Sequence, residues 1–225
     1  MSVRYALYYV PKRDDPIYTL GSDWLGWDSH AGQKIERDEN LHIDLITKKP
    51  AIYGFHATLK PPFHLKDGVR ESDIIDKLDE FSRNLPTVDP IELDLKQIGS
   101  FLAFVPKDDQ SNISLLAERC VKEFDLFRRE MTEEEFDRRN NETLTANQVA
   151  HLSHWGYPYV MEEFRFHMTL TDKLEANQIE PTLQHLTQFF SGLLAITRRI
   201  DQIVLSKQPG PTESFRTLHV AELSI

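Results

Sequence analysis

Hydrophobic residues recur along this chain with two different periods. Strict alternation of apolar and polar side chains is the pattern of a half-buried strand, whereas apolar residues three and four positions apart form one face of a helix. Alternation and short apolar runs predict strands over residues 3–10, 53–60, 91–95, 101–105, 163–171, 200–205 and 215–223.

Helices are predicted between these strands. The first has Ile74, Leu78 and Phe81 on its apolar face, Ser72 as its N-cap, and Pro86 at its end. A long helical region is predicted over 112–154, and it contains two capping-box pairs, Thr132 with Glu135 and Thr145 with Gln148. A last helix is predicted to open at Glu180-Pro181.

The two halves of the chain present these elements in the same order. Each half has one strand, then a helix, then two strands, at nearly equal spacing. This order predicts one α+β domain over residues 1–225 with two pseudo-symmetric lobes around a central cleft, and a helical insertion at about 111–158 between them. The alternative is chance, because this order of elements is common in proteins.

Composition narrows the class of protein. A chain of 225 residues with 40% hydrophobic and 28% charged residues is ordinary for one globular domain. We expect a cytoplasmic protein with no membrane partner, because we find no apolar run of roughly 18 residues and no secretory leader. The single cysteine, Cys120, fits a reducing compartment. The net charge of −10 disfavours long nucleic acids and favours a small phosphorylated substrate.

Two short segments carry the candidate chemistry. Residues 55–59 read F-H-A-T-L and residues 166–170 read F-H-M-T-L, at equivalent places in the two halves. A third H-x-T, at 185–187, falls in a helical pattern, where i and i+2 do not share a face, and we treat it as chance. On a strand, alternate side chains share a face. The predicted polar rows are His56, Thr58 and Lys60 on the first strand, and Arg165, His167 and Thr169 on the second.

These residue types suit acid–base chemistry on a phosphodiester. Histidine titrates near pH 6.5, so one ring can accept a proton while the other donates one. Thr58 and Thr169 would bond the non-bridging oxygens, and Lys60 or Arg165 would offset their charge. Such a mechanism requires neither a metal nor a cofactor. The alternative is a pair of strand histidines whose ring nitrogens are satisfied by structural hydrogen bonds.

The segments YGFHATLKPPF at 53–63 and FRFHMTLT at 164–171 resemble the two H-x-T motifs of the two-histidine (2H) phosphoesterase superfamily. The resemblance covers nearly the whole chain. Within the superfamily, the chain is similar to a branch of unknown function that accompanies phosphonate-utilisation genes in bacteria. It implies a bilobal α+β fold whose motif strands face each other across a cleft. It also implies metal-independent cyclic phosphodiesterase chemistry and a cyclic ribosyl or nucleoside phosphate as substrate. Further segments that carry it are RYALYYVP, WLGWD, GSFLAFVP, LTANQ and WGYPYV. Its carried-over catalytic residues are His56, Thr58, His167 and Thr169.

Other readings stay open at this point. Trp24 and Tyr157 would either line the cleft and bind substrate or pack the edges of the fold. His151 and His154 have helical spacing and would form half of a metal site in a metal-dependent phosphatase, although no nearby ligand completes it. A phosphate- or nucleotide-binding regulator without turnover would keep the same pocket. The oligomeric state, and which histidine is the base, are not determined by the sequence.

Overall fold

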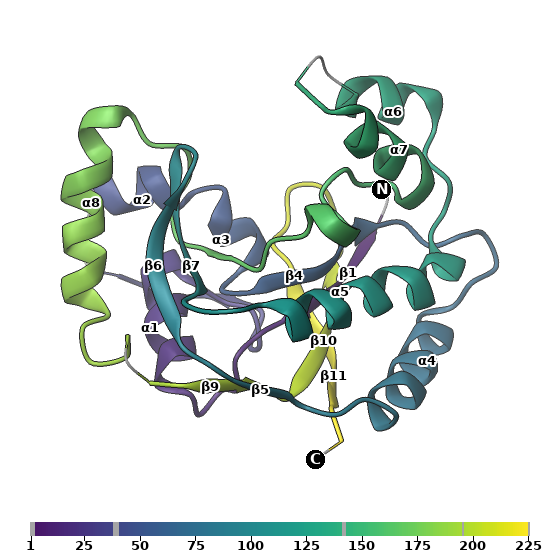
Figure 1. Ribbon diagram of the computed structural model, residues 1–225, viewed down its shortest axis with the longest axis horizontal. Helices are drawn as coiled ribbons and strands as arrows, with labels where there is room; N and C mark the ends of the chain where they lie inside the picture. Colours follow the sequence, from purple (N-terminus) through teal and green to yellow (C-terminus); the bar gives the residue numbers. More distant parts are fainter. Residues whose placement is uncertain (1–2, 38–40, 141–142, 195, 225) are drawn as a thin grey trace.

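The computed structural model describes every residue except 1–2, 38–40, 141–142, 195 and 225. Its centre is a seven-stranded sheet in the order β11-β10-β1-β4-β8-β7-β6, in which each pairing is antiparallel (Figure 1). The strands are β1 (Arg4–Tyr9), β4 (Ala57–Phe63), β6 (Leu93–Ile98), β7 (Phe101–Pro106), β8 (Met168–Thr169), β10 (Gln202–Gln208) and β11 (Arg216–Glu222). Two small ribbons pair β2 (Trp27–Asp28) with β3 (Gln33–Lys34), and β5 (Val88–Ile91) with β9 (Arg198–Ile200).

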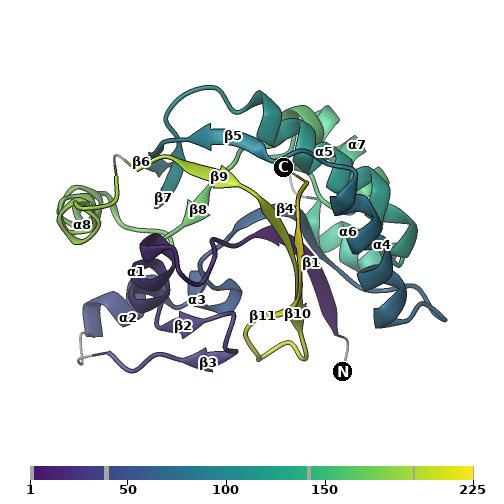
Figure 2. The same cartoon turned by 90° about the horizontal axis from the view of Figure 1, so that it is seen from below.

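Helices cover the sheet from two sides (Figure 2). α4 packs against β10 and β11, α5 packs against β4, and α8 packs against β6 and β7. In Figure 2, α1, α2 and α3 lie on the other side of β1 from α4 and α5. The helices are α1 (Pro16–Leu25), α2 (Leu41–Thr47), α3 (Pro50–Tyr53), α4 (Glu71–Arg83), α5 (Ser111–Phe124), α6 (Glu133–Arg139), α7 (Ala146–Trp155) and α8 (Ala176–Phe189), with short 3-10 turns η1 (Asp125–Phe127) and η2 (Met161–Glu163). Within the described parts of the chain, no helix is both long and apolar enough to cross a membrane.

The predicted mixture of helices and strands is confirmed, but two helix starts are wrong. α4 begins at Glu71 rather than behind Ser72, because the Asp73 carboxylate accepts the Arg70 backbone N–H at 2.9 Å and caps the helix earlier. α8 begins at Ala176, so Pro181 lies inside the helix rather than opening it. Both predicted capping boxes are present, at the starts of α6 and α7.

Two predicted strands differ in extent. The second motif was expected within a strand over 163–171, but only Met168–Thr169 joins the sheet. The first motif strand continues through Pro61 and Pro62 to Phe63. Prolines are tolerated there because they fall between the residues that pair with β1, where the register shifts.

The predicted pair of pseudo-symmetric lobes is not confirmed. The hairpin β6–β7 follows the first motif in the chain, yet β7 pairs with β8, the strand of the second motif. The hairpin β10–β11 follows the second motif in the chain, yet β10 pairs with β1, which in turn pairs with β4, the strand of the first motif. The two motif strands are hydrogen-bonded neighbours in one sheet, not strands facing each other across a cleft.

Candidate active site

The two H-x-T segments meet in the middle of the sheet. β4 and β8 are antiparallel, with Ala57 opposite Met168, so the register pairs the middle residues of the two motifs. Both of these side chains are 0% exposed, and the flanking residues point to the opposite face. In this register each histidine lies opposite the threonine of the other motif. The four residues brought together are His56 opposite Thr169, and His167 opposite Thr58.

His56 is held in one tautomer by its neighbours. Its Nδ1 lies 2.9 Å from the carbonyl oxygen of Gly54, so Nδ1 carries the proton and donates it. Nε2 therefore presents a lone pair, and the Thr58 hydroxyl lies 3.2 Å from it. Burial lowers the pKa of His56 to about 4; the hydrogen bond to Gly54 opposes this effect and the charge of His167 adds to it. At neutral pH the ring is unprotonated.

His167 makes the same backbone contact in the second motif. Its Nδ1 lies 2.8 Å from the carbonyl oxygen of Arg165, two residues earlier in the chain, as Gly54 precedes His56. Thus both motifs point the Nε2 atom away from the backbone contact. The Arg165 side chain is exposed, and its predicted role toward substrate stays a prediction.

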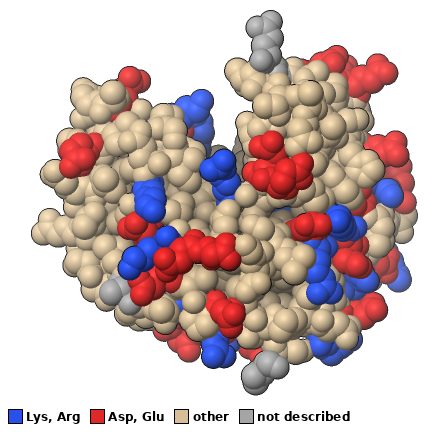
Figure 3. Space-filling view, viewed as in Figure 1, with Lys and Arg blue, Asp and Glu red and all other residues tan. Residues whose placement is uncertain are grey.

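Aromatic rings border the two histidines. The Tyr8 ring centroid lies 4.0 Å from that of His56, and Tyr53 lies 6.0 Å from it in a stacked arrangement. Phe101 lies 5.9 Å from His167. Figure 3 shows a notch between the side of the molecule that carries α2 and α8 and the side that carries α6 and α7, with Lys and Arg on its wall. The segment that leads into β8 runs between these two sides (Figure 1).

Tyr157, one of the predicted substrate residues, comes two residues after the end of α7. It is half-buried, and burial raises the pKa of its hydroxyl, with further raising effects from Tyr159 and Tyr53 and a lowering effect from Arg139. Its ring packs edge-on against Tyr159 with the ring centroids 5.6 Å apart, and its predicted role toward substrate stays a prediction.

Trp24, the other aromatic candidate, does not reach that face. It is 2% exposed, and its Nε1 donates to the carbonyl oxygen of Leu170 at 2.8 Å. Its ring packs edge-on against His185 at 5.5 Å. The structure therefore supports packing rather than substrate contact, and places Trp24 behind the second motif, where it anchors the residue after Thr169.

Lys60 was predicted to share a face with His56 and Thr58, and this is wrong. Thr58 is opposite Tyr8 and Lys60 is opposite Leu7, so two residues of β4 correspond to one step along β1. This register shift turns Lys60 to the other face. Lys60 is 1% exposed, and its Nζ donates to Asp125 at 3.3 Å and to the carbonyl oxygen of Val121 at 3.1 Å.

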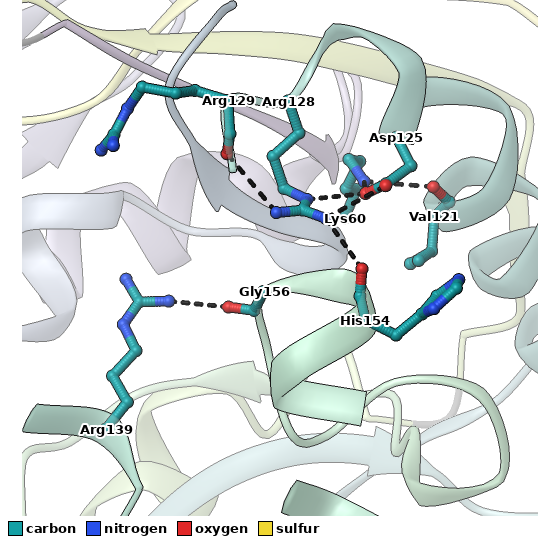
Figure 4. Close-up of polar contacts among 8 residues, drawn as sticks. All are labelled: Lys60, Val121, Asp125, Arg128, Arg129, Arg139, His154 and Gly156. Atoms are coloured by element: carbon teal, nitrogen blue, oxygen red, sulfur yellow. Dashed lines mark hydrogen bonds and ion pairs between the residues drawn. The ribbon is translucent and has the colours of Figure 1, made fainter. Parts of the chain in front are cut away.

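The same buried region anchors the helical insertion (Figure 4). Arg128 donates to the Asp125 carboxylate at 2.7 Å and to the carbonyl oxygen of His154 at 2.8 Å. Arg139 donates to the carbonyl oxygen of Gly156 at 2.8 Å. These bonds satisfy carbonyl groups at the end of α7 and so fix the position of the following residue, Tyr157.

His151 and His154, the pair considered for a metal, lie beside a separate cavity of about 1200 Å³. Neither His56 nor His167 lines it. The His151 Nε2 lies 3.1 Å from a Glu162 oxygen, and His154 packs against Trp155. Over the described residues, no group of three or more His, Cys, Asp or Glu side chains is arranged to hold a metal ion.

Sequence reasoning missed two residues that border His56: Tyr8 and Tyr53. A signal existed for Tyr8, because it lies in the predicted strand over residues 3–10. No local pattern indicated Tyr53 as a neighbour of His56, because it comes from α3.

Comparison with known proteins identifies the family. The chain is 34% identical over 221 residues to a protein of Janthinobacterium sp. (strain Marseille) named ribose 1,5-bisphosphate phosphokinase PhnN, covering 94% of this chain and 49% of that protein. A protein of the same name from Laribacter hongkongensis (strain HLHK9) is 28% identical over 216 residues, covering 95% of this chain and 50% of that protein. The chain thus spans about half the length of the curated relatives it matches. The model of a family described as "Protein of unknown function (DUF1045)" matches residues 58–216, well over half of the chain, and the chain belongs to this family.

Proposed function

We propose that this chain is a metal-independent hydrolase of a small cyclic phosphodiester, in which His56 and His167 act as base and acid. The observation that supports this most directly is the register of β4 and β8, which sets each histidine opposite the threonine of the other motif. The arrangement supplies two proton-transfer groups and two hydroxyl donors on one face. This is the composition that opening a phosphodiester ring requires.

The protonation of His56 suggests how the roles divide. Since its pKa is lowered to about 4 and Nδ1–H is bonded to Gly54, Nε2 is a proton acceptor at neutral pH. In the proposed step, water attacks phosphorus and gives its proton to Nε2 of His56. The new P–O bond forms as one ring P–O bond breaks. His167, as the proposed acid, gives its Nε2 proton to the leaving sugar oxygen, so the product is a phosphate monoester and a free hydroxyl.

The substrate we propose is a cyclic phosphate of ribose or of a nucleoside, and the setting is phosphonate utilisation, as the resemblance to 2H phosphoesterases implies. The names of the two relatives add one chemical link. Opening a phosphate ring that joins O1 and O2 of ribose 5-phosphate, by breaking the bond to O2, gives ribose 1,5-bisphosphate. That is the compound in the relatives' name. The phosphokinase activity itself belongs to those longer proteins.

The experiment measures hydrolysis of nucleoside 2′,3′-cyclic phosphates and of ribosyl cyclic phosphates in the presence of EDTA. His56→Ala and His167→Ala are each expected to lower the rate roughly 10²- to 10⁴-fold, because each removes one proton-transfer group. The matched control is His185→Ala, the histidine of the third H-x-T sequence, which is exposed on α8. Tight binding of these compounds without turnover would favour a regulator instead. Rates that survive both motif substitutions would exclude the assignment.

A further inference from the structure

Tyr8 lies on the face of β1 that continues the candidate active site. Its register partner on β4 is Thr58, and cross-strand partners point their side chains to the same face of a sheet. Its ring lies against that of His56, with the ring centroids 4.0 Å apart. Tyr8 is therefore next to the histidine proposed as the base and next to the threonine proposed to bond a non-bridging oxygen of the phosphodiester.

The Tyr8 hydroxyl lacks a hydrogen-bond partner. Tyr8 is 1% exposed, and no residue that the structure describes bonds its hydroxyl. Leaving a buried hydroxyl unpaired costs folding free energy, so a folded protein that keeps one calls for an explanation. Burial raises the pKa of Tyr8, so the hydroxyl stays protonated and able to donate at neutral pH.

The rings around Tyr8 offer its hydroxyl no acceptor. Both nitrogens of His56 are engaged, Nδ1 with the Gly54 carbonyl oxygen and Nε2 with the Thr58 hydroxyl. The ring of Phe215, whose centroid lies 5.7 Å from that of Tyr8, has no polar atom. An acceptor for this hydroxyl therefore comes from outside the chain, as an ordered water or as an atom of a bound substrate.

Tyr53 is the outer ring of the cluster that contains Tyr8. It stacks on His56 with the centroids 6.0 Å apart and on Phe215 at 5.4 Å, and these are two rings that Tyr8 also contacts. Tyr53 is partly exposed, whereas Tyr8 and Phe215 are buried. Tyr53 is therefore the ring that a ligand beside His56 has to move in order to reach the Tyr8 hydroxyl.

We propose that the Tyr8 hydroxyl donates a hydrogen bond to a non-bridging oxygen of the reacting phosphoryl group, the same oxygen that Thr58 contacts. The inference rests on the proposed function and adds a third donor to the two threonines. The non-bridging oxygens carry the negative charge of the phosphodiester, so they are the strongest acceptors that the substrate brings to the site. A donor held on the sheet without a competing partner stabilises that charge without giving up a bond in the free protein.

Tyr8→Phe tests this donor, with Tyr9→Phe as the matched control. Both changes remove one hydroxyl from a buried ring of β1, but Tyr9 lies on the other face, and its hydroxyl donates to the carbonyl oxygen of Arg199 at 3.4 Å. With a cyclic phosphate that the wild type hydrolyses, Tyr8→Phe should lower kcat/KM about 10- to 100-fold, because it removes a hydrogen bond to a charged oxygen. Tyr9→Phe should leave kcat/KM within about two-fold.

Thermal unfolding separates this role from packing. Tyr8→Phe removes only a hydroxyl that has no partner in the fold, so the midpoint of thermal unfolding should stay equal to that of the wild type or rise. Unchanged kcat/KM in Tyr8→Phe would overturn the inference and leave an ordered water as the partner of the hydroxyl, while the hydrolase proposal stayed intact.

Sulfur substitution in the substrate separates direct contact from an indirect effect. In a nucleoside 2′,3′-cyclic phosphorothioate, sulfur replaces one non-bridging oxygen, and the two diastereomers place it on opposite sides of phosphorus. Because sulfur is the weaker acceptor, one diastereomer should shrink the rate losses of both Tyr8→Phe and Thr58→Val to a few-fold. The other diastereomer should do the same for Thr169→Val. A loss in Tyr8→Phe that is equal for the phosphate and both diastereomers, or that follows Thr169→Val, would overturn the assigned contact.

A binding measurement covers the case in which no cyclic phosphate is turned over. Adenosine 2′,3′-cyclic phosphate is titrated into the wild type, Tyr8→Phe and Tyr9→Phe in a calorimeter. Binding that Tyr8→Phe weakens about tenfold or more, and that Tyr9→Phe leaves unchanged, would support the hydroxyl contact even though the hydrolase proposal had failed. Equal binding to all three proteins, or no binding to the wild type, would exclude the contact.

Discussion

The two H-x-T motifs have the same local geometry and very different surroundings. In each, the histidine Nδ1 contacts the carbonyl oxygen two residues earlier, at 2.9 Å for His56 and 2.8 Å for His167. The first motif opens the seven-residue strand β4, which is paired along much of its length with β1. The second motif contributes only the two-residue strand β8. The exposed Arg165 lies two residues before its histidine.

The shared motif fixes the tautomer of each histidine through its backbone contact, while the surroundings of His56 set its protonation. The backbone contact is local and therefore repeats wherever the motif does. Enclosure by Tyr8 and Tyr53 is tertiary and belongs to His56, whose pKa burial lowers to about 4. Environments that treat two titratable groups differently are the usual way in which a site divides base from acid.

The largest effect is expected when one histidine is removed at a time and the rate is followed with pH. Both alanine variants should lose roughly 10²- to 10⁴-fold, but the pH profiles should differ. A base must be unprotonated, so kcat/KM of the wild type should fall as the pH is lowered through about 4, where His56 becomes protonated. This acid limb of the pH profile should remain in His167→Ala, which keeps His56. If the acid limb is lost in His167→Ala and kept in His56→Ala, then His167 is the base and His56 is the acid.

A backbone change at the first motif tests the support of His56. Gly54 has φ +77, and a Cβ added there would lie 2.9 Å from the Cβ of Ser29. Gly54→Ala should therefore move the carbonyl that holds Nδ1 and lower kcat by up to about 10²-fold, since small displacements of a catalytic group are costly. Gly68→Ala is the matched control, because Gly68 also has positive φ but no atom within 4 Å of the added Cβ. Equal rate losses in both variants would point to general strain instead.

A milder change tests the support of the second motif. Trp24→Phe keeps an aromatic ring in the core and removes the bond from Nε1 to the Leu170 carbonyl oxygen. The unpaired carbonyl should reduce the free energy of unfolding by about 1–3 kcal/mol, and the loosened β8 should lower kcat several-fold. Denaturant unfolding and steady-state kinetics measure the two effects. A rise in KM alone would instead return Trp24 to the role of substrate contact.

The smallest effect on activity is expected at Lys60. Lys60→Met should leave kcat/KM within about two-fold, because the amine bonds Asp125 on the other face of β4. Burial lowers the pKa of Lys60 from 10.5 to about 8, against the raising effect of Asp125. Between these two pH values the unfolded chain binds the proton and the folded chain does not. The free energy of unfolding of the wild type should therefore rise with pH across that window relative to Lys60→Met. A large loss of activity would restore the predicted substrate role.

Much of the fold's local structure follows from the sequence alone. Capping boxes such as Thr132 with Glu135 and Thr145 with Gln148 define helix starts through contacts three residues apart, and these are present. The strand around Tyr8 follows from alternation, and the mixed α+β class follows from the order of elements. The two matched H-x-T segments singled out the residues that the sheet then brings together.

Strand register, burial and the side on which a residue lies depend on pairing between distant segments, and only the tertiary structure shows them. One register shift between β1 and β4 moved Lys60 away from His56, and no local pattern encodes such a shift. Burial made Trp24 an anchor for the residue after Thr169 rather than a substrate contact, and packing between distant segments placed Tyr53 against His56. The physical reason is that side-chain periodicity and caps are properties of a few consecutive residues, whereas register, burial and pKa arise from contacts between segments that the sequence separates widely.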